Sequence, residues 1–191
     1  MKPIKLTMKA FGSYGEETTI DFTRPNQKLF LITGDTGAGK TTIFDAITYA
    51  LYGKNSSMMN SKNGLEIQSQ YADFSLPPYV DFTFSEIQNG QECIYKIHRE
   101  LHHLHKNKSG KNAYRPISEK ITLLLPDNNA YIGDIQKKIN EIIGLTREQF
   151  MQVAMLAQGE FMKLLRTESK DKKVIFRQLL KPKYFSALLM K

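Results

Sequence analysis

The chain has 191 residues, of which 41% are hydrophobic and 24% are charged, and its formal net charge is +8. This composition supports a packed core and excludes a wholly disordered chain, since 11 Phe and 9 Tyr are spread along it. The single cysteine excludes an internal disulfide, and no apolar stretch approaches the roughly 18 residues of a membrane span. We therefore expect a cytoplasmic protein with no membrane partner.

The first part of the chain predicts three strands and a helix. Residues 2–10 and 17–23 alternate apolar and polar side chains around a turn with two glycines, which indicates an antiparallel pair. The apolar run KLFLIT at 28–33 is typical of a buried strand. A helix over 40–53 follows, because its apolar residues recur at helical spacing and Gly53 is a suitable stop.

The rest of the chain predicts an antiparallel meander followed by helices. Strands are expected at 79–86, 92–100 and 118–125, and helices at 131–143, 147–166 and 169–181. Asn89-Gly90 is a strong hairpin signal between the first two of these strands. Residues 54–78 and the basic, polar stretch 101–116 are predicted to be loops.

One motif carries chemistry: residues 34–41 match the phosphate-binding pattern G-x-x-x-x-G-K-[ST] between an expected strand and an expected helix. Its glycines let backbone N–H groups surround phosphate oxygens at a helix N-terminus. Lys40 is expected to reach the β- and γ-phosphates, and Thr41 to hold Mg²⁺. The predicted ATP-binding residues are Gly34, Asp35, Thr36, Gly37, Ala38, Gly39, Lys40, Thr41 and Thr42.

A phosphate loop of this kind needs a second, metal-side carboxylate, usually at the end of an apolar strand. The nearest candidate is Asp127 after the run ITLLLP, but Pro126 ends that strand early and the run is also typical of an ordinary sheet strand. We therefore expect the catalytic acid to come from outside these residues.

Three segments together resemble the N-terminal ATPase lobe of the SbcC family of DNA double-strand-break-repair ATPases. They are KLTMKAFGSYGEETTIDF, GDTGAGKTTIFDAITYALYG and REQFMQVAMLAQGEFMKLL, and the resemblance runs over residues 2–181. It implies an α/β P-loop fold of the ABC-type ATPase class, an N-terminal lobe with a mixed sheet and an antiparallel β-meander. Residues 1–181 would form this lobe of a split head, and residues 182–191 would begin a coiled coil or mark the end of the piece.

The resemblance also implies a role for Gln158 and a set of partners. Gln158 would be the Q-loop glutamine that contacts Mg²⁺ and the attacking water, and with Lys40 it would be catalytic. The C-terminal lobe of the same head would supply the signature motif and the catalytic glutamate, and a second head would join in an ATP-bound dimer. A Mn²⁺-dependent nuclease subunit, SbcD, would bind, and ATP-driven closure would control DNA ends. ATP hydrolysis is then expected only with the C-terminal lobe.

The distribution of charge leaves alternatives open. Residues 96–120 carry seven Lys or Arg against two acids, and residues 160–191 carry nine against three, so the remainder is net acidic. These segments fit either solvated faces or non-specific DNA binding. The alternatives to an ATPase lobe are a self-contained P-loop kinase or small NTPase, and a non-catalytic DNA-binding module. The histidines at 98, 102, 103 and 105 near Cys93 lack carboxylates at ligand spacing, so an exposed basic loop is favoured over a metal site.

Overall fold

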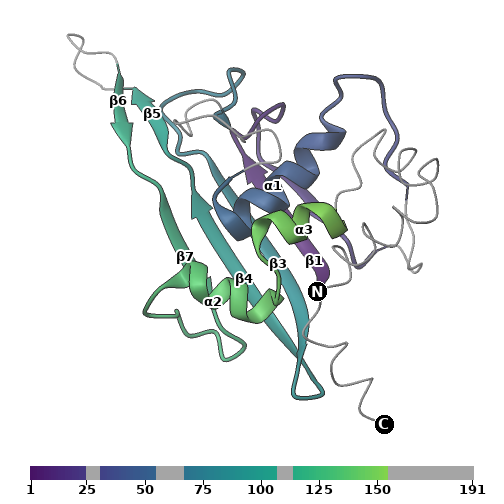
Figure 1. The fold of residues 1–191 in the computed structure, drawn as a ribbon. Coiled ribbons are helices and arrows are strands. Elements are labelled where there is room, and N and C mark those ends of the chain that lie inside the picture. Colours follow the sequence, from purple (N-terminus) through teal and green to yellow (C-terminus); the bar gives the residue numbers. More distant parts are fainter. Residues whose placement is uncertain (25–30, 55–66, 107–113, 155–191) are drawn as a thin grey trace, which may run out of the picture. The chain divides into compact units, whose positions relative to one another are not determined.

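The computed structural model describes residues 1–24, 31–54, 67–106 and 114–154 (Figure 1). The chain divides into two compact units, residues 1–144 and residues 145–191. The sheets and two of the helices belong to the first unit. The second unit contributes one described helix, α3 (Arg147–Ala154).

The first unit is built on a five-stranded sheet in the order β2-β1-β3-β4-β7, and every pairing in it is antiparallel. Its strands are β1 (Lys2–Lys9), β2 (Thr18–Asp21), β3 (Tyr79–Gln88), β4 (Gln91–Glu100) and β7 (Lys120–Leu124). A separate two-stranded sheet pairs β5 (His103–Lys106) with β6 (Tyr114–Ile117), beyond the ends of β4 and β7 (Figure 1). The helices are α1 (Lys40–Tyr52) and α2 (Ile135–Ile143).

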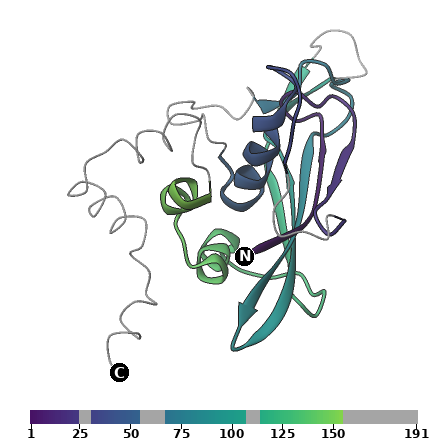
Figure 2. The same ribbon diagram turned by 90° about the vertical axis from the view of Figure 1, so that its right-hand side faces the viewer.

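The core lies between one face of the five-stranded sheet and the two helices, which cover that face (Figure 2). Alternation along the strands sends apolar side chains inward, and Leu6, Phe82, Ile97 and Leu123 are fully buried there. The other face is polar, and His98 pairs there with Asp81 at 2.8 Å. This one-sided pattern is the reason that the sheet folds with helices on a single side.

Several sequence-based predictions are confirmed. The strands expected at 2–10 and 17–23 are β1 and β2, and those expected at 79–86, 92–100 and 118–125 are β3, β4 and β7. The hairpin at 89–90 joins β3 to β4, with both of its residues at positive φ, 51° and 82°. α1 ends at Tyr52 and Gly53 is its C-cap residue, whose N–H donates to Tyr49 O at 2.7 Å. The antiparallel meander is therefore present as expected.

Two predictions are wrong. The stretch 101–116 contains a β-hairpin rather than only a loop, because Gln68 bonds both backbone groups of Leu104 (3.0 and 3.2 Å) and so holds β5 in place. Residues 31–33, the described part of the strand expected at 28–33, are not a strand, and Leu31 is 85% exposed. A central strand needs a hydrogen-bonding neighbour, and none of the described strands pairs with this run.

The remaining predictions concern boundaries and the C-terminal part. The helix expected at 131–143 begins only at Ile135, since Asp134 caps it by accepting from Lys137 N at 2.9 Å. Residues 147–154, the described part of the helix expected at 147–166, form α3. The helix expected at 169–181 and the domain boundary at 181–182 lie outside the described residues and stay predictions. None of the helices in the described part of the chain has the length and apolarity to span a membrane.

Candidate functional site: a phosphate loop at the start of α1

The predicted phosphate loop leads directly into α1. Residues 34–38 are exposed, and the loop closes in a turn in which Ala38 N donates to Asp35 O at 3.1 Å. Gly37 and Gly39 have φ values of +87° and +83°, which side chains other than glycine rarely adopt. The predicted residues Gly34, Asp35, Thr36, Gly37, Ala38 and Gly39 form one continuous loop before the helix, with a hydrogen-bonded turn in its middle.

The N-terminus of α1 is suited to an anion. Gly39 is its N-cap residue, no side chain caps it, and its first turn contains no acidic residue. The first N–H groups of a helix have no partner within the helix, and the helix dipole places partial positive charge there. The start of α2, by contrast, is occupied by the Asp134 side chain. The backbone at the start of α1 can therefore donate to phosphate oxygens.

Lys40 lies against its own loop. Its Nζ donates to the carbonyl oxygens of Gly34 and Asp35 at 2.7 and 2.6 Å. Both bonds hold the ammonium beside the turn that the glycines form. The contacts are to exposed backbone, so Lys40 can exchange them for phosphate oxygens without leaving a buried group unpaired.

The two threonines after Lys40 differ in exposure. Thr41 is exposed and Thr42 is half-buried, with its Oγ1 3.3 Å from Ser13 Oγ. An exposed hydroxyl oxygen at the position of Thr41 is the kind of hard ligand that Mg²⁺ accepts. Thr42 instead joins the loop to a neighbouring turn.

That turn, residues 10–16 between β1 and β2, packs against the phosphate loop. Tyr14 OH donates to Gly39 O at 3.4 Å, and a Cβ on Gly39 would lie 3.1 Å from the Tyr14 ring. A Cβ on Gly12 would lie 2.6 Å from Thr42 Cγ2. Burial raises the pKa of Tyr14, which keeps its hydroxyl protonated as a donor. From the sequence, Lys9, Phe11 and Ser13 lie where they could approach a nucleotide, but nothing local requires it, so Ser13 is not among the predicted site residues; Tyr14 is not singled out at all.

The catalytic half of the site is not among the described residues. Gln158, predicted to contact Mg²⁺ and water, lies outside them. Asp127 is held in its own turn, where its carboxylate accepts from Asn129 N and Nδ2 at 3.0 and 2.9 Å, and these bonds lower its pKa. It follows β7 at the opposite edge of the sheet from the β1–β2 turn. The geometry therefore gives no support to Asp127 as the metal-side acid.

The histidines of the stretch 98–105 lie in different surroundings. His98 lies on the polar face of the sheet with Asp81, while His103 is buried, with its Nδ1 2.8 Å from Leu101 O. Cys93 lies opposite Glu86 in the register of β3 and β4, near the N-terminal end of β4. Within the described ranges no group of three or more His, Cys, Asp or Glu could hold a metal ion.

Comparisons with known proteins place the whole chain rather than its single residues. A family described as "AAA domain" matches residues 5–190, which confirms the α/β P-loop ATPase fold expected from the sequence. The chain is 36% identical over 190 residues to the SbcC component of nuclease SbcCD from Staphylococcus aureus strains MRSA252, JH9 and Newman. Each alignment covers 98% of this chain and 18% of the relative, so the chain spans about a fifth of the length of these relatives. The resemblance to SbcC proteins is thus confirmed.

Among solved structures, the "SMC head domain from Thermotoga maritima" is similar to this chain. The two share 23% sequence identity, with a TM-score of 0.39, over 74% of this chain and 41% of that one.

Proposed function

Because the chain belongs to the AAA domain family, we propose that it is the ATP-binding N-terminal half of the ATPase head of a DNA-repair nuclease complex. One observation carries the proposal: a glycine-rich loop delivers the uncapped start of α1 and the Lys40 ammonium to the same place. That arrangement recognises the phosphates of a nucleoside triphosphate. The nucleotide that we propose for this loop is ATP.

The chemistry assigned to the described residues is binding and charge stabilisation. The backbone N–H groups of Gly37 and of residues 39–41 donate to the phosphates, while that of Ala38 stays bonded to Asp35 O. Lys40 turns from its loop carbonyls to the β- and γ-phosphate oxygens. The exposed Thr41 hydroxyl fits a Mg²⁺ ion, which when bound neutralises phosphate charge, and Gln158 is proposed as its second contact. Thr42 remains bonded to Ser13 and fixes the first turn.

The proposed partners follow from the relatives. Their name makes them one component of the nuclease SbcCD, and the chain is similar to about a fifth of their length. We assign the signature motif and the catalytic glutamate to a C-terminal lobe of the same head, and dimerisation to a second head. The Mn²⁺-dependent nuclease subunit SbcD completes the complex, which processes DNA ends in the cytoplasm.

A DNA-contacting role is assigned to the β5–β6 hairpin. Lys106 and Arg115 are exposed on facing strands, in register with Tyr114 and His105 respectively. Lysines and arginines of this kind contact phosphates without reading bases, so binding is expected to be non-specific. The kinase or small-NTPase alternative is not favoured, because its acid would be Asp127 in the turn with Asn129.

ATP binding by calorimetry tests the proposal, with Lys40→Ala as the decisive variant and Lys5→Ala, an exposed lysine on β1, as the matched control. Lys40→Ala removes a charge-assisted contact worth about 1.5–3 kcal/mol, so affinity should fall roughly ten- to hundredfold. Lys5→Ala should bind as the parent does. Equal ATP affinity in the parent chain and in both variants would contradict the phosphate-loop assignment. It would also contradict the alternative of a self-contained P-loop kinase.

A further inference from the structure

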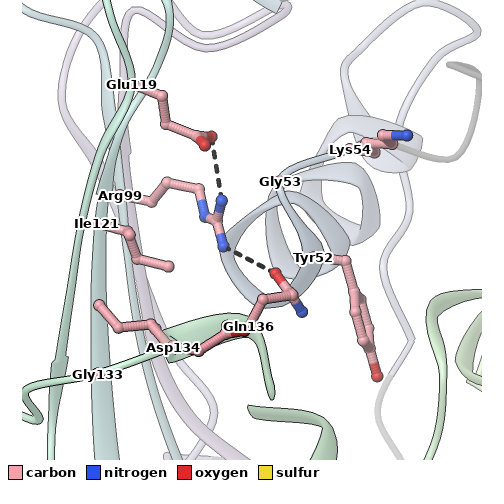
Figure 3. Close-up of a pocket in the computed structure, with 10 residues that line it drawn as sticks. Tyr52, Gly53, Lys54, Arg99, Glu119, Ile121, Gly133, Asp134 and Gln136 are labelled. Atoms are coloured by element: carbon pink, nitrogen blue, oxygen red, sulfur yellow. Dashed lines mark hydrogen bonds and ion pairs between the residues drawn. The ribbon is translucent and has the colours of Figure 1, made fainter. Parts of the chain in front are cut away.

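The C-terminal end of α1 meets a buried arginine from β4. Arg99 is 3% exposed, and its Nε donates to Ala50 O at 3.1 Å. Its Nη1 forms an ion pair with Glu119 at 3.1 Å, and its Nη2 donates to Gln136 Oε1 at 3.5 Å (Figure 3). A single guanidinium thereby joins α1 to β4, to the residue before β7 and to α2.

Gln136 completes this attachment from α2. Its Nε2 donates to Leu51 O at 3.1 Å, next to the carbonyl that Arg99 binds. The last carbonyls of a helix have no partner in the helix itself. At α1 the carbonyls of Ala50 and Leu51 accept from side chains of two other elements, so the end of this helix is fixed by tertiary contacts.

The charges at this end also favour a fixed position. α1 has no basic residue in its last turn, and the helix dipole leaves partial negative charge there. Arg99 supplies the missing cation, and Glu119 balances it. Tyr49 OH donates to Glu119 Oε1 at 2.9 Å, and burial raises the pKa of Tyr49, so this hydroxyl remains a donor. A Cβ on Gly53 would lie 2.5 Å from Arg99 Nη1, so the guanidinium packs directly on the glycine that ends the helix.

The two ends of α1 therefore have different partners. The N-terminal end contacts the β1–β2 turn through Ser13 and Tyr14, and the C-terminal end contacts Arg99 and Gln136. A helix of 13 residues is a stiff rod roughly 20 Å long, so a shift at one end moves the other.

We propose that Arg99 and Gln136 are positioning residues for the phosphate loop. They hold the C-terminal end of α1 against β4 and α2, and through the helix they set the place of the backbone N–H groups at its start. Both are distant in sequence from the glycine-rich motif, and their bonds reach α1 at Ala50 and Leu51, at the opposite end of the helix from the loop. This inference rests on the proposed ATP-binding function of the loop.

The variants that test it are Arg99→Lys and Gln136→Leu, with His98→Gln as the control on the same strand. Lysine keeps the charge but lacks the planar set of donors that serves three acceptors. Leucine keeps bulk at 136 but cannot donate to Leu51 O. His98 lies on the opposite, polar face, paired with Asp81, so its variant reports the effect of disturbing β4 alone.

Two measurements are made on the 191-residue chain. Calorimetry gives the Kd for ATP with Mg²⁺ at a temperature where circular dichroism shows each variant folded. We expect the Kd to rise at least about fivefold in Arg99→Lys and Gln136→Leu, the low end of coupling between separate sites, and to stay unchanged in His98→Gln. Hydrogen exchange is followed at the amides of residues 43–46, which donate to the carbonyls of the N-cap and the first turn of α1, and we expect faster exchange there in the first two variants only.

A purely local role for Arg99 and Gln136 would speed exchange near residues 50–53 and leave exchange at residues 43–46 and the Kd as in the parent. That result would overturn the proposal. Equal effects in His98→Gln would overturn it too. If Arg99→Lys does not fold, Gln136→Leu decides the question, since Gln136 is only half-buried. A parent chain that binds no ATP would contradict the proposed function, while the exchange measurement would still report on the positioning.

Discussion

Gly39 is the residue at which the phosphate loop becomes a helix, and two constraints act on it. Its φ of +83° lies in the left-handed region, and its buried position places it against Tyr14 and Ser13. The first constraint costs any other residue roughly 1–2 kcal/mol. The second prevents a side chain from being accommodated without moving the β1–β2 turn. Glycine is thus required here by both conformation and packing.

Gly39→Ala should therefore destabilise the protein by more than Gly90→Ala does. Gly90 also has positive φ, at 82°, but a Cβ there would meet nothing within 4 Å. We expect Gly90→Ala to cost about 1 kcal/mol of conformational strain, and Gly39→Ala to cost that plus the contact with Tyr14. Urea unfolding measures both. Equal losses of unfolding free energy would show that the turn yields freely to a methyl group.

The residues of the site differ in whether their position can be predicted from their neighbours in the sequence. The turn before α1 can be predicted because the pattern from Gly34 to Thr41 consists of consecutive residues and is complete in the sequence, whereas its phosphate-binding role stays a prediction. Tyr14 and Arg99 cannot, because each acts on α1 from a strand or turn far along the chain. A buried arginine in an alternating strand gives no sign of its partners until the strands are aligned.

At the scale of elements, the β5–β6 hairpin shows why a polar stretch is wrongly predicted as a loop. Its strands alternate weakly, and Pro116 argues against a strand. Pro116 lies opposite Leu104, whose N–H and C=O bond the Gln68 side chain instead, so no bond between the two strands is lost. At 31–33 the error is the opposite one, since a strand is predicted and none is found. The cause is the same, because an apolar run forms a strand only where a neighbouring strand supplies hydrogen bonds.

The same hairpin and the basic residues that follow β5 in the sequence carry the prediction about DNA. Replacing Lys106, Lys108 and Lys111 by Ala should weaken binding to any duplex sequence equally and reduce its salt dependence. Each phosphate contact contributes about 0.9 to the slope of log affinity against log salt, so the slope should fall by about 2 to 3. Fluorescence anisotropy at several salt concentrations measures this.

The control for that experiment removes the same charge elsewhere. Lys2, Lys5 and Lys137 are exposed in the first unit, the first two on β1 and the third on α2, and all lie outside the basic segments at 96–120 and 160–191. Their triple Ala variant should keep most of the affinity and the slope. A parent chain with no salt slope, or equal losses in the two triple variants, would mean that the hairpin is only a solvated surface and that net charge alone attracts DNA.

At the scale of the whole molecule, the described residues bring a glycine-rich loop, Lys40 and an exposed threonine hydroxyl to the start of α1, and the proposed function assigns these to the phosphates and a metal ion. Asp127 is held in its own turn and does not join them. The antiparallel meander and its order can be predicted from hairpin and alternation signals. The conformation of residues 31–33 cannot be predicted in this way, because a strand there needs a hydrogen-bonding partner strand, and none of the described strands pairs with it.

The purified 191-residue chain should consequently hydrolyse ATP very slowly, and should gain activity when the C-terminal lobe of the same head is added. Phosphoryl transfer depends almost entirely on positioning and charge stabilisation. Since the described ranges bring no acid to the loop to orient water, the rate should be lower by orders of magnitude. Steady-state phosphate release measures this, with Lys40→Ala as the blank. Lysine-dependent turnover near about 1 per second by the chain alone would be typical of a complete enzyme. It would mean that the catalytic acid lies within these 191 residues and that the self-contained NTPase is the better description.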